Sequence, residues 1–358
     1  MPDELLEVRD AARAFERIEE WLAERGFFST DNGDRVADVY LGYGLSQSIR
    51  RDASPLPAEP CAALPLAACR VRSGPLRAVH FEAAPKIGAW ERTWTEAEYR
   101  AAVDDVRAAI ARGDVYQVNL VQHLEAPFAG DPRAFKTCLA GLRPLHPDAF
   151  VTDEWAVVSA SPELFLACRG DRIWTMPIKG TRPRGGAADL RASEKDAAEH
   201  VMIVDLERND LSRVCKAGTV RWPELMATRE LAGVEHMVST VEGTLRDGVG
   251  LAEILHATFP GGSVTGAPKI AAVDLIAQLE PVGRGASMGA VGRINGNGDF
   301  DLALTIRTFA IADVSIHLWV GGGIVWDSDP ATEVEESWVK ARPLLAAVGS
   351  PLPEFALA

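Results

Sequence analysis

Residues 286–311 read ASMGAVGRINGNGDFDLALTIRTFAI, and this stretch says most about the fold. Two mainly apolar runs, 286–294 and 301–311, flank Asn295-Gly296, a dipeptide that favours a tight turn between antiparallel strands. We therefore predict a hairpin here. The next apolar run, 314–320, predicts a further strand directly after the hairpin.

Outside this hairpin, strand clusters are interspersed with helices. Strands are predicted over 36–44, 78–81, 115–124, 155–159, 163–168 and 172–178. Helices are predicted over 3–25, 95–113, 193–211, 267–279 and 332–347, with a capping box at Thr95 and Glu98. Because strands and helices do not alternate regularly, the pattern predicts an α+β fold. Residues 1–90 are interpreted as a short variable N-terminal lobe of the same overall fold, and residues 91–350 as the main domain.

Composition excludes several classes of partner. The 358 residues are 47% hydrophobic and carry a formal charge of −14, which argues against binding to nucleic acid or to an anionic membrane. No apolar segment reads as a secretory signal or as a membrane span. The five cysteines show no Cys-x-x-Cys spacing, which is typical of reduced thiols. We therefore expect a cytoplasmic protein.

One lysine stands in a setting that suits a nucleophile. Residues 176–184 read MPIKGTRPR, so Lys179 lies between a proline-stiffened strand end and a Gly-Thr turn. A lysine attacks only as the neutral amine, and both desolvation and neighbouring cations lower its pKa. Arg182 and Arg184 are the candidate cations. Taken alone, the segment also fits a surface turn with solvated basic residues.

Two predicted helices each present a pair of carboxylates at helical spacing. Asp196 and Glu199 share one face of the first helix, and Glu333 and Glu336 share one face of the second, with Lys340 one turn further on. Mg²⁺ takes oxygen ligands and uses a few protein carboxylates together with an anionic substrate. The pattern thus suggests a magnesium site, although two solvated acidic faces would show the same spacing.

Two glycine-rich segments could present backbone amides to an anion. Residues 259–269 read FPGGSVTGAPK, and Gly261 and Gly266 frame four residues as in a phosphate-binding loop. However, Ala267-Pro268 intervene before the lysine, so a nucleotide loop is not predicted and the lysine should point elsewhere. Residues 321–323 are three glycines at a predicted strand end, where either an anion site or a tight bend is possible.

Taken in order, these segments resemble the chorismate-utilising enzymes over roughly residues 95–345. The resemblance rests on residues 113–120, 159–163, 177–181, 199–200, 205–210, 236, 260–269, 306–308 and 321–340. It implies a catalytic domain in which two large, mainly antiparallel sheets pack together with helices outside.

Two positions suggest the branch of this family. Relatives that add water to chorismate carry a lysine where this chain has Gln117, so the resemblance implies use of ammonia. Anthranilate synthases typically carry alanine where this chain has Lys179, whereas aminodeoxychorismate synthases carry lysine. The resemblance therefore implies amination of chorismate at C4 through a covalent lysine adduct. An anthranilate synthase and a non-catalytic chorismate-binding subunit remain as alternatives.

The resemblance also implies a role for each site residue. Lys179 would be the nucleophile and Glu163 the general acid, with His236 and Gln117 also at the reacting centre. Mg²⁺ would be held by Glu199 and Glu336 with help from Asp196 and Glu333. The expected substrate-binding residues are Thr181, Thr265, Gly266, Arg307, Gly321, Gly322, Gly323 and Lys340. Ammonia would come from a separate glutamine amidotransferase subunit or from solution.

The pattern departs from the family at one position and in its N-terminal lobe. Arg293 follows Gly292 where many relatives have a tyrosine near the enolpyruvyl group. The N-terminal lobe shows no tryptophan-binding segment, so feedback inhibition by tryptophan is not predicted.

Overall fold

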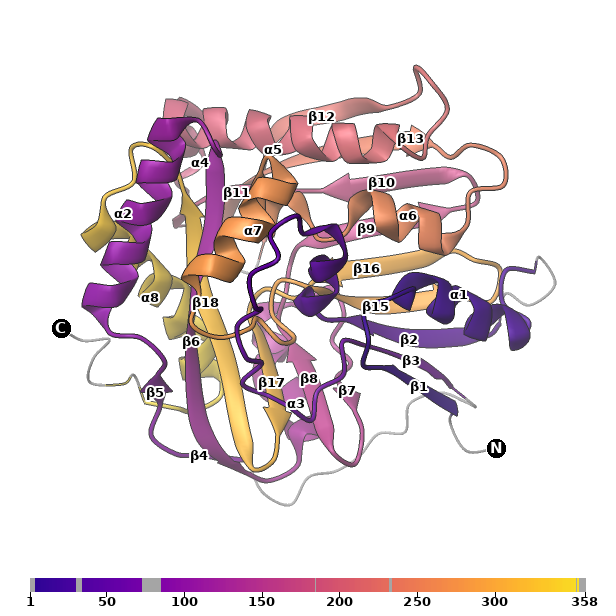
Figure 1. The fold of residues 1–358 in the computed structure, drawn as a ribbon, viewed down its shortest axis with the longest axis horizontal. Helices are drawn as coiled ribbons and strands as arrows, with labels where there is room; N and C mark the ends of the chain where they lie inside the picture. Colours follow the sequence, from indigo (N-terminus) through magenta and orange to yellow (C-terminus); the bar gives the residue numbers. More distant parts are fainter. Residues whose placement is uncertain are drawn as a thin grey trace.

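The computed structural model describes residues 4–29, 34–72, 85–183, 185–231, 234–351 and 353. Two antiparallel sheets form the molecule, and helices flank them (Figure 1). This arrangement confirms the predicted α+β fold.

The ten-stranded sheet contains the two paired strands of the predicted hairpin, β15 and β16. Its order is β1 (Glu4–Val8), β3 (Ala67–Val71), β2 (Val36–Leu41), β15 (Ala290–Asn295), β16 (Phe300–Leu304), β9 (Leu164–Arg169), β10 (Arg172–Met176), β13 (Val234–Thr244) and β11 (Ile178–Pro183), and β12 (Arg221–Leu231) also pairs with β13. The three N-terminal strands thus continue the sheet that contains the main-domain strands. The predicted boundary near residue 90 stays a prediction, and the predicted strand 78–81 lies outside the described residues.

The eight-stranded sheet is built around two long neighbouring strands. Its order is β14 (Gly266–Ala267), β6 (Gln117–Ala129), β18 (Ser315–Ile324), β17 (Thr308–Ala312), β8 (Trp155–Ser159) and β7 (Phe150–Val151), and both β4 (Lys86–Ile87) and β5 (Glu91–Arg92) pair with β6.

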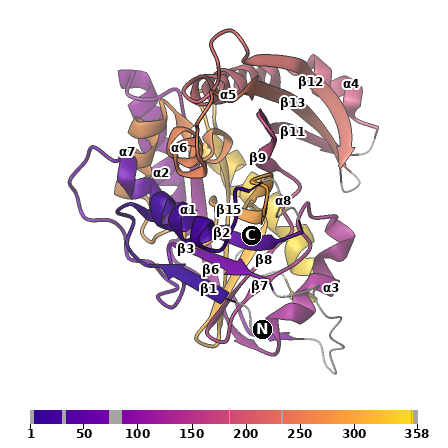
Figure 2. The same ribbon diagram turned by 90° about the vertical axis from the view of Figure 1, so that its right-hand side faces the viewer.

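The helices lie on the outer faces of the sheets. They are α1 (Ala14–Glu24), α2 (Glu96–Arg112), α3 (Phe135–Leu139), α4 (Ala187–Ala192), α5 (Glu194–Ser212), α6 (Leu251–Thr258), α7 (Lys269–Leu279) and α8 (Pro330–Ala347). Helices α2 and α8 pack together beside β18, while α1 and α6 contact each other at the other end of the molecule (Figure 1). Helix α5 lies along β12 and β13 (Figure 2). None of the helices in these described ranges has the length and apolar character needed to cross a bilayer.

Local signals placed the main helices correctly. Thr95 and Glu98 form the predicted capping box of α2, and Gly113 ends that helix in the left-handed region. The Ser193 hydroxyl caps α5 by accepting from the backbone N–H of Asp196. Helix α7 begins at Lys269, directly after Pro268 and two residues later than the predicted start at 267.

The predicted hairpin is confirmed, but its second strand is shorter than expected. β15 and β16 pair through Ile294 and Phe300, and the predicted run 301–311 is divided between β16 and β17. These two strands belong to different sheets, so the chain crosses from one sheet to the other over residues 305–307. Arg307 has a φ of 52° at this crossing. Apolar periodicity did not reveal the crossing because the residues on both sides of it are buried.

Two further predictions were wrong in a similar way. Residues 3–25 were expected to form one helix, but β1 precedes α1 and pairs with β3, 59 to 67 residues away in the chain. Residues 172–178 were expected to form one strand, but Pro177 separates β10 from β11. In both cases pairing with a distant strand decides the local structure.

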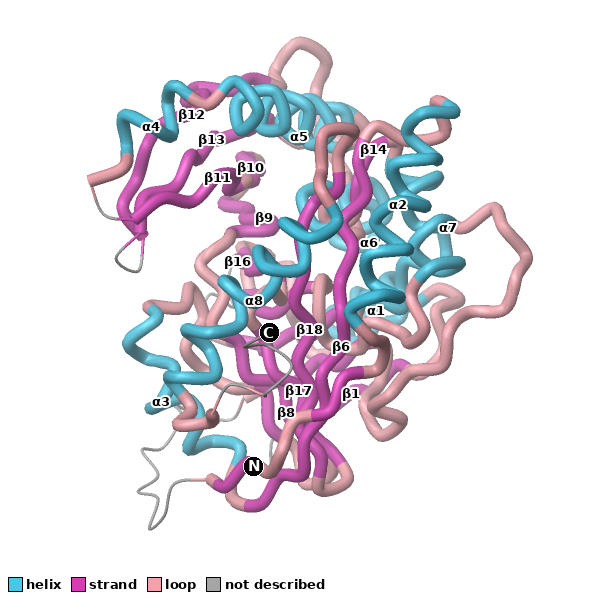
Figure 3. Tube along the Cα trace, turned by 90° about the vertical axis from the view of Figure 1, so that its left-hand side faces the viewer, coloured by secondary structure: helices cyan, strands magenta, loops and turns pink. Residues whose placement is uncertain are grey.

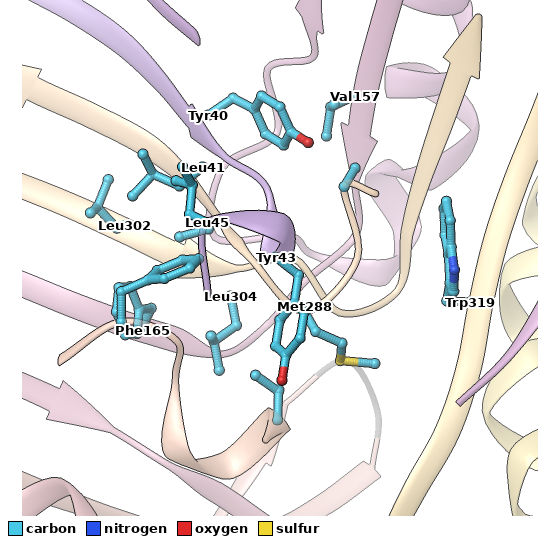
Figure 4. Close-up of a cluster of buried hydrophobic side chains, with 14 of the residues drawn as sticks. Tyr40, Leu41, Tyr43, Leu45, Val157, Phe165, Met288, Leu302, Leu304 and Trp319 are labelled. Carbon is cyan, nitrogen blue, oxygen red and sulfur yellow. The ribbon is translucent and has the colours of Figure 1, made fainter. Parts of the chain in front are cut away.

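The core lies where residues of both sheets meet. Figure 4 shows Phe165 and Leu304 of the ten-stranded sheet on one side of Tyr43, and Trp319 of the eight-stranded sheet beyond Met288. Burial of large side chains at about 25 cal/mol per Å² is the main stabilising contribution to such a core. The site residues described next are therefore attached to a rigid framework.

Candidate active site

The predicted catalytic side chains come from both sheets. Glu163 lies directly before β9, Lys179 is in β11 and His236 is in β13, all in the ten-stranded sheet, whereas Gln117 begins β6 of the other sheet. Helix α5, which carries Glu199, contacts β11 and β13 of one sheet and β14 of the other (Figure 3). The site therefore lies where one helix bridges two sheets.

Glu199 is the centre of the hydrogen-bond network. Its Oε1 accepts from Lys179 Nζ at 2.9 Å and from Gln117 Nε2 at 2.9 Å. Lys179 Nζ also donates to the carbonyl oxygen of Ser263 at 3.3 Å. Burial would raise the pKa of Glu199, but the ammonium of Lys179 outweighs burial and holds that pKa below its ordinary value. The pair is therefore ionised.

The expectation that Lys179 has a lowered pKa is wrong for this arrangement. Burial would lower the pKa of Lys179, but the carboxylate of Glu199 raises it above the ordinary value. Arg184 and the side chain of Arg182, the expected cations, lie outside the described part of the chain. Lys179 must lose a proton before it can attack, and its ion pair with Glu199 opposes that loss.

Glu163 has the environment of a general acid. Its buried Oε1 accepts from the Ser263 hydroxyl at 2.8 Å and from the Ile178 N–H at 3.3 Å. Burial raises the pKa of Glu163 above its ordinary value, although Lys179 and Arg307 oppose this. A carboxyl group with a raised pKa stays protonated closer to neutral pH and can donate a proton to a leaving group.

His236 and Arg307 lie at the same side of the site. His236 is buried, and its Nδ1 donates to the carbonyl oxygen of Gly180 at 3.1 Å, while burial lowers its pKa. Burial also lowers the pKa of Arg307, and the charge of Glu163 opposes this. Among the described residues, the Arg307 guanidinium has no hydrogen bond or ion pair. It is therefore available to an anionic ligand, as predicted.

The three glycines at 321–323 do not form a turn. The glycines lie within β18, and β18 pairs with β6 along its whole length. On its other edge, β18 pairs with β17 only as far as Leu318. Beyond that point, the edge of β18 away from β6 has no strand partner in the described ranges. Of the two alternatives for these glycines, the tight bend is excluded. The backbone groups of this strand edge face away from the sheet, and Gly321 O accepts from Lys340 Nζ at 2.9 Å.

Because glycine has no side chain, there is room beside these residues for the acidic side chains. A Cβ atom on Gly322 would lie 3.1 Å from Lys340 Nζ, 3.4 Å from Glu336 Oε1 and 3.5 Å from Glu333 Oε2. The Glu333 Oε1 atom accepts from the Ser328 hydroxyl at 2.6 Å. The second predicted helix therefore directs its carboxylates to this strand.

The neighbouring glycine faces the first helix. A Cβ atom on Gly323 would lie 2.9 Å from Glu199 Oε1 and 2.0 Å from Gln117 Nε2. Asp196, the other predicted acid of α5, lies beside Gly180, where a Cβ atom would be 3.3 Å from its Cγ. The structure thus brings Glu199 of α5 and Glu336 of α8 to the adjacent residues Gly323 and Gly322 of β18.

The remaining predicted binding residues have mixed environments. Thr265 is fully buried, and its hydroxyl accepts from Tyr43 at 3.4 Å. Gly266 has a φ of 136°, and a Cβ atom there would lie 2.2 Å from the carbonyl oxygen of Gln117, so only glycine fits. The backbone of Thr181 pairs with His236, and the side chain of Thr181 lies outside the described part.

Two sequence features that pointed elsewhere are now accounted for. Lys269 donates to Asp210 at 2.5 Å and to Thr258 O at 2.8 Å, which agrees with the rejection of a nucleotide loop. Arg293, which stands where many relatives have a tyrosine, pairs with Asp148 and lies 3.7 Å from Asp38.

Comparison with known proteins agrees with this geometry. A family model described as chorismate binding enzyme matches residues 32–346. The chain belongs to the chorismate-binding enzymes.

Relatives in this family have two different names. The chain is 41% identical to anthranilate synthase component 1 of Thermus thermophilus over 284 residues, which are 77% of this chain and 62% of that protein. It is 40% identical to aminodeoxychorismate synthase component 1 of Klebsiella aerogenes over 266 residues, 72% of this chain and 59% of that protein. The chain thus spans less than two thirds of the length of these relatives.

A solved structure has the same fold. Anthranilate synthase component I of Streptococcus pneumoniae superposes with a TM-score of 0.81 at 26% sequence identity, covering 91% of this chain and 84% of that one. The two-sheet architecture is therefore that of the chorismate-binding enzymes.

Sequence reasoning missed two groups that support this family site. Ser263 connects Glu163 and Lys179 through its hydroxyl and its carbonyl oxygen, and its position in a glycine-rich segment was the available signal. Arg284 and Glu280 form a fully buried pair, in which Arg284 also donates to Val264 O at 3.0 Å. Their i, i+4 spacing resembled an exposed ion pair, so burial was not evident.

The donor chemistry of the site fits a magnesium ion. No three acidic or histidine side chains of the described residues converge as a preformed metal cluster. However, Glu199 and Glu336 present carboxylate oxygens at Gly323 and Gly322, where there is no Cβ to fill the space. Mg²⁺ keeps several waters and needs only one or two protein carboxylates besides an anionic substrate. Glu199 and Glu336 are therefore the residues that would hold it.

Proposed function

We propose that this chain is an aminodeoxychorismate synthase component I, which converts chorismate and ammonia into 4-amino-4-deoxychorismate. The observation that carries the proposal is the position of Ser263 between two reactive groups. Its carbonyl oxygen accepts from Lys179 Nζ at 3.3 Å, and its hydroxyl donates to Glu163 at 2.8 Å. A nucleophile and a general acid are thus held on either side of one residue.

The proposed reaction has two covalent steps. Lys179 first loses one proton to solvent water, and its free amine then attacks C2 of chorismate. The ring double bonds shift, and the C4 hydroxyl leaves as water with the proton of Glu163. Ammonia then attacks C4, the double bonds shift back, and Lys179 leaves C2. Splitting one difficult substitution into two displacements is the advantage of nucleophilic catalysis.

Charged groups around these residues support binding of a dianionic substrate. Arg307 is free for a bidentate contact with a carboxylate, and Lys340 lies on the edge of β18. A bound Mg²⁺ would neutralise a substrate carboxylate at Glu199 and Glu336. Gln117, which cannot deprotonate water, supports ammonia as the nucleophile, and His236 completes the wall beside Gly180.

Ammonia in this proposal comes from a partner amidotransferase that hydrolyses glutamine. The relatives named component 1 imply a second component for those proteins. High concentrations of ammonium should replace the partner.

The second candidate is an anthranilate synthase component I. Relatives with that name reach the same identity as those named aminodeoxychorismate synthase, so overall similarity does not choose between the two. Lys179 and its contact with Ser263 favour the first candidate, because amination at C2 needs no lysine adduct at that carbon.

Mass spectrometry of the intact protein tests the proposal. We expect that incubation with chorismate and Mg²⁺, without ammonia, adds a chorismate-derived mass to the wild type and none to Lys179→Ala. After ammonium is added, a lyase should convert the product into 4-aminobenzoate. An unmodified wild type that forms fluorescent anthranilate would instead establish the second candidate.

A further inference from the structure

A small cavity lies behind the wall of the candidate active site. It is lined by Phe165, Thr175, Glu207, Thr258 and Gly262, among other residues, and has room for about one water-sized molecule. The proposed reaction gives these side chains no role.

The cavity shares its wall with the general acid. Gly262 directly precedes Ser263, whose hydroxyl donates to Glu163 at 2.8 Å. Phe165 is in β9 and follows Glu163 by two residues in the chain, and the charge of Glu163 acts on Glu207 of this cavity. The cavity is therefore next to the group that protonates the leaving hydroxyl at C4.

Glu207 lines this cavity and has a free hydrogen-bonding position among the described residues. Only 7% of the residue is exposed, and its Oε2 accepts from the Thr175 hydroxyl at 3.2 Å. Its Oε1 has no hydrogen-bond partner among the described residues. The other buried acids of α5 are paired, Glu199 with Lys179 and Asp210 with Lys269.

We propose that this cavity is a binding site for ammonia, with Glu207 and Thr175 as its hydrogen-bonding partners. The inference rests on the proposed function, since it concerns the nitrogen substrate of that reaction. Ammonia has the size of a water molecule, and its N–H groups suit the free carboxyl oxygen and the hydroxyl. The cavity would hold it one residue away from the Ser263–Glu163 contact.

Glu207 also supplies a way to use ammonium ions. The ionised form of Glu207 accepts one proton from a bound ammonium, so that one N–H bond breaks, one O–H bond forms, and neutral ammonia keeps the electron pair needed for attack. Burial, together with the charges of Glu163 and Asp210, raises the pKa of Glu207 well above its ordinary value, so its carboxylate is a stronger proton acceptor than an ordinary glutamate.

Thermal unfolding of the full chain tests the site without any substrate. We expect ammonium chloride at 100 mM to raise the Tm of the wild type by about 2 °C relative to tetramethylammonium chloride, because a ligand that binds only the folded state stabilises it. The rise should disappear in Glu207→Gln. An equal rise with potassium chloride would show a general monovalent-cation site and overturn the proposal.

Kinetics with ammonium as nitrogen donor supply the second test. Glu207→Gln should raise the half-saturating ammonium concentration about tenfold or more, and Thr175→Val about threefold. The matched control is Asp205→Asn, an exposed carboxyl of α5 that pairs with Arg208 and should have no effect. The isosteric Thr175→Val also keeps the test decisive if Glu207→Gln does not fold.

The two proposals fail in different ways. A wild type without lysine adduct or aminated product refutes the proposed function, while the thermal shift still decides whether the cavity binds ammonium. An active enzyme whose ammonium dependence is unchanged in both Glu207→Gln and Thr175→Val refutes the ammonia site alone.

Discussion

Helix α5 makes two buried ion pairs with lysines, and the two pairs differ in what surrounds them. Glu199 pairs with Lys179 at 2.9 Å, and Asp210 pairs with Lys269 at 2.5 Å. The lysine side chains are 11% and 10% exposed, so burial does not distinguish them. Lys269 Nζ also donates to the carbonyl oxygen of Thr258. In the other pair, the Glu199 oxygen that accepts from Lys179 also accepts from Gln117 of the other sheet.

This difference shows that a buried ion pair is not by itself a sign of catalysis. The Lys269 pair joins the start of α7 to α5, and its Asp210 lines the cavity that also contains Glu207. The Lys179 pair lies beside Ser263, Glu163 and the glycines of β18. The residues around a buried ion pair thus decide whether it serves catalysis or stability.

The strongest test of the comparison is removal of the two lysines. Lys179→Ala should lower kcat about 10⁴-fold or more, because it removes the proposed nucleophile. Lys269→Met should retain most of the wild-type kcat per folded molecule. Formation of 4-amino-4-deoxychorismate, followed after coupling to a lyase, measures both. Similar losses in the two variants would mean that both pairs act structurally.

Glu163→Gln should give the next largest effect. Loss of a general acid costs about 10²- to 10⁴-fold in rate. Because burial raises the pKa of Glu163, its acid form persists to higher pH than that of an ordinary glutamic acid, and the wild-type rate should fall as pH rises through that raised value. The variant should lose this descending limb. A pH–rate profile over pH 5–9 that keeps the same limb in the variant would assign the limb to another group.

Lys269→Met should have the larger effect on stability. It leaves Asp210 buried without its cation, which costs roughly 3–5 kcal/mol in the free energy of unfolding. Urea denaturation measures this change. The double variant Lys269→Met with Asp210→Leu should recover most of the loss, since no unpaired charge remains. If the single variant is as stable as the wild type, the pair does not join α7 to α5.

The smallest expected effect is that of Gln117→Leu. It removes the second donor to Glu199 and should lower kcat about tenfold, corresponding to one hydrogen bond to a charged group. Initial rates at saturating chorismate measure this loss. If Gln117→Leu causes the same loss in the Lys179→Ala variant as in the wild type, the two donors do not act together.

The sequence predicted elements that depend on nearby residues. The capping box of α2 and the Asn295-Gly296 hairpin are local, and both were placed correctly. The strand β1 was missed because its pairing with β3 lies far away in the chain. The β12–β13 hairpin was missed as well, although it carries His236.

The site was predicted as a set of residues, while its electrostatics were not. The structure brings Lys179, Glu199, Gln117 and the glycines of β18 together, as the order of the family motifs implied. The raised pKa of Lys179 could not be predicted, because it depends on a carboxylate from another element. The same is true of the Glu207 cavity, whose lining comes from α5, β9, β10 and the segment after α6.

The crossing at residues 305–307 has a consequence for dividing this protein into fragments. One continuous segment from β15 to β18 supplies strands to both sheets, and its crossing residue Arg307 lies in the site. A chain cut at residues 305–307 would separate β16 from β17, which belong to different sheets. Fragment complementation and circular permutation should therefore keep this crossing whole and open the chain in connections that stay within one sheet.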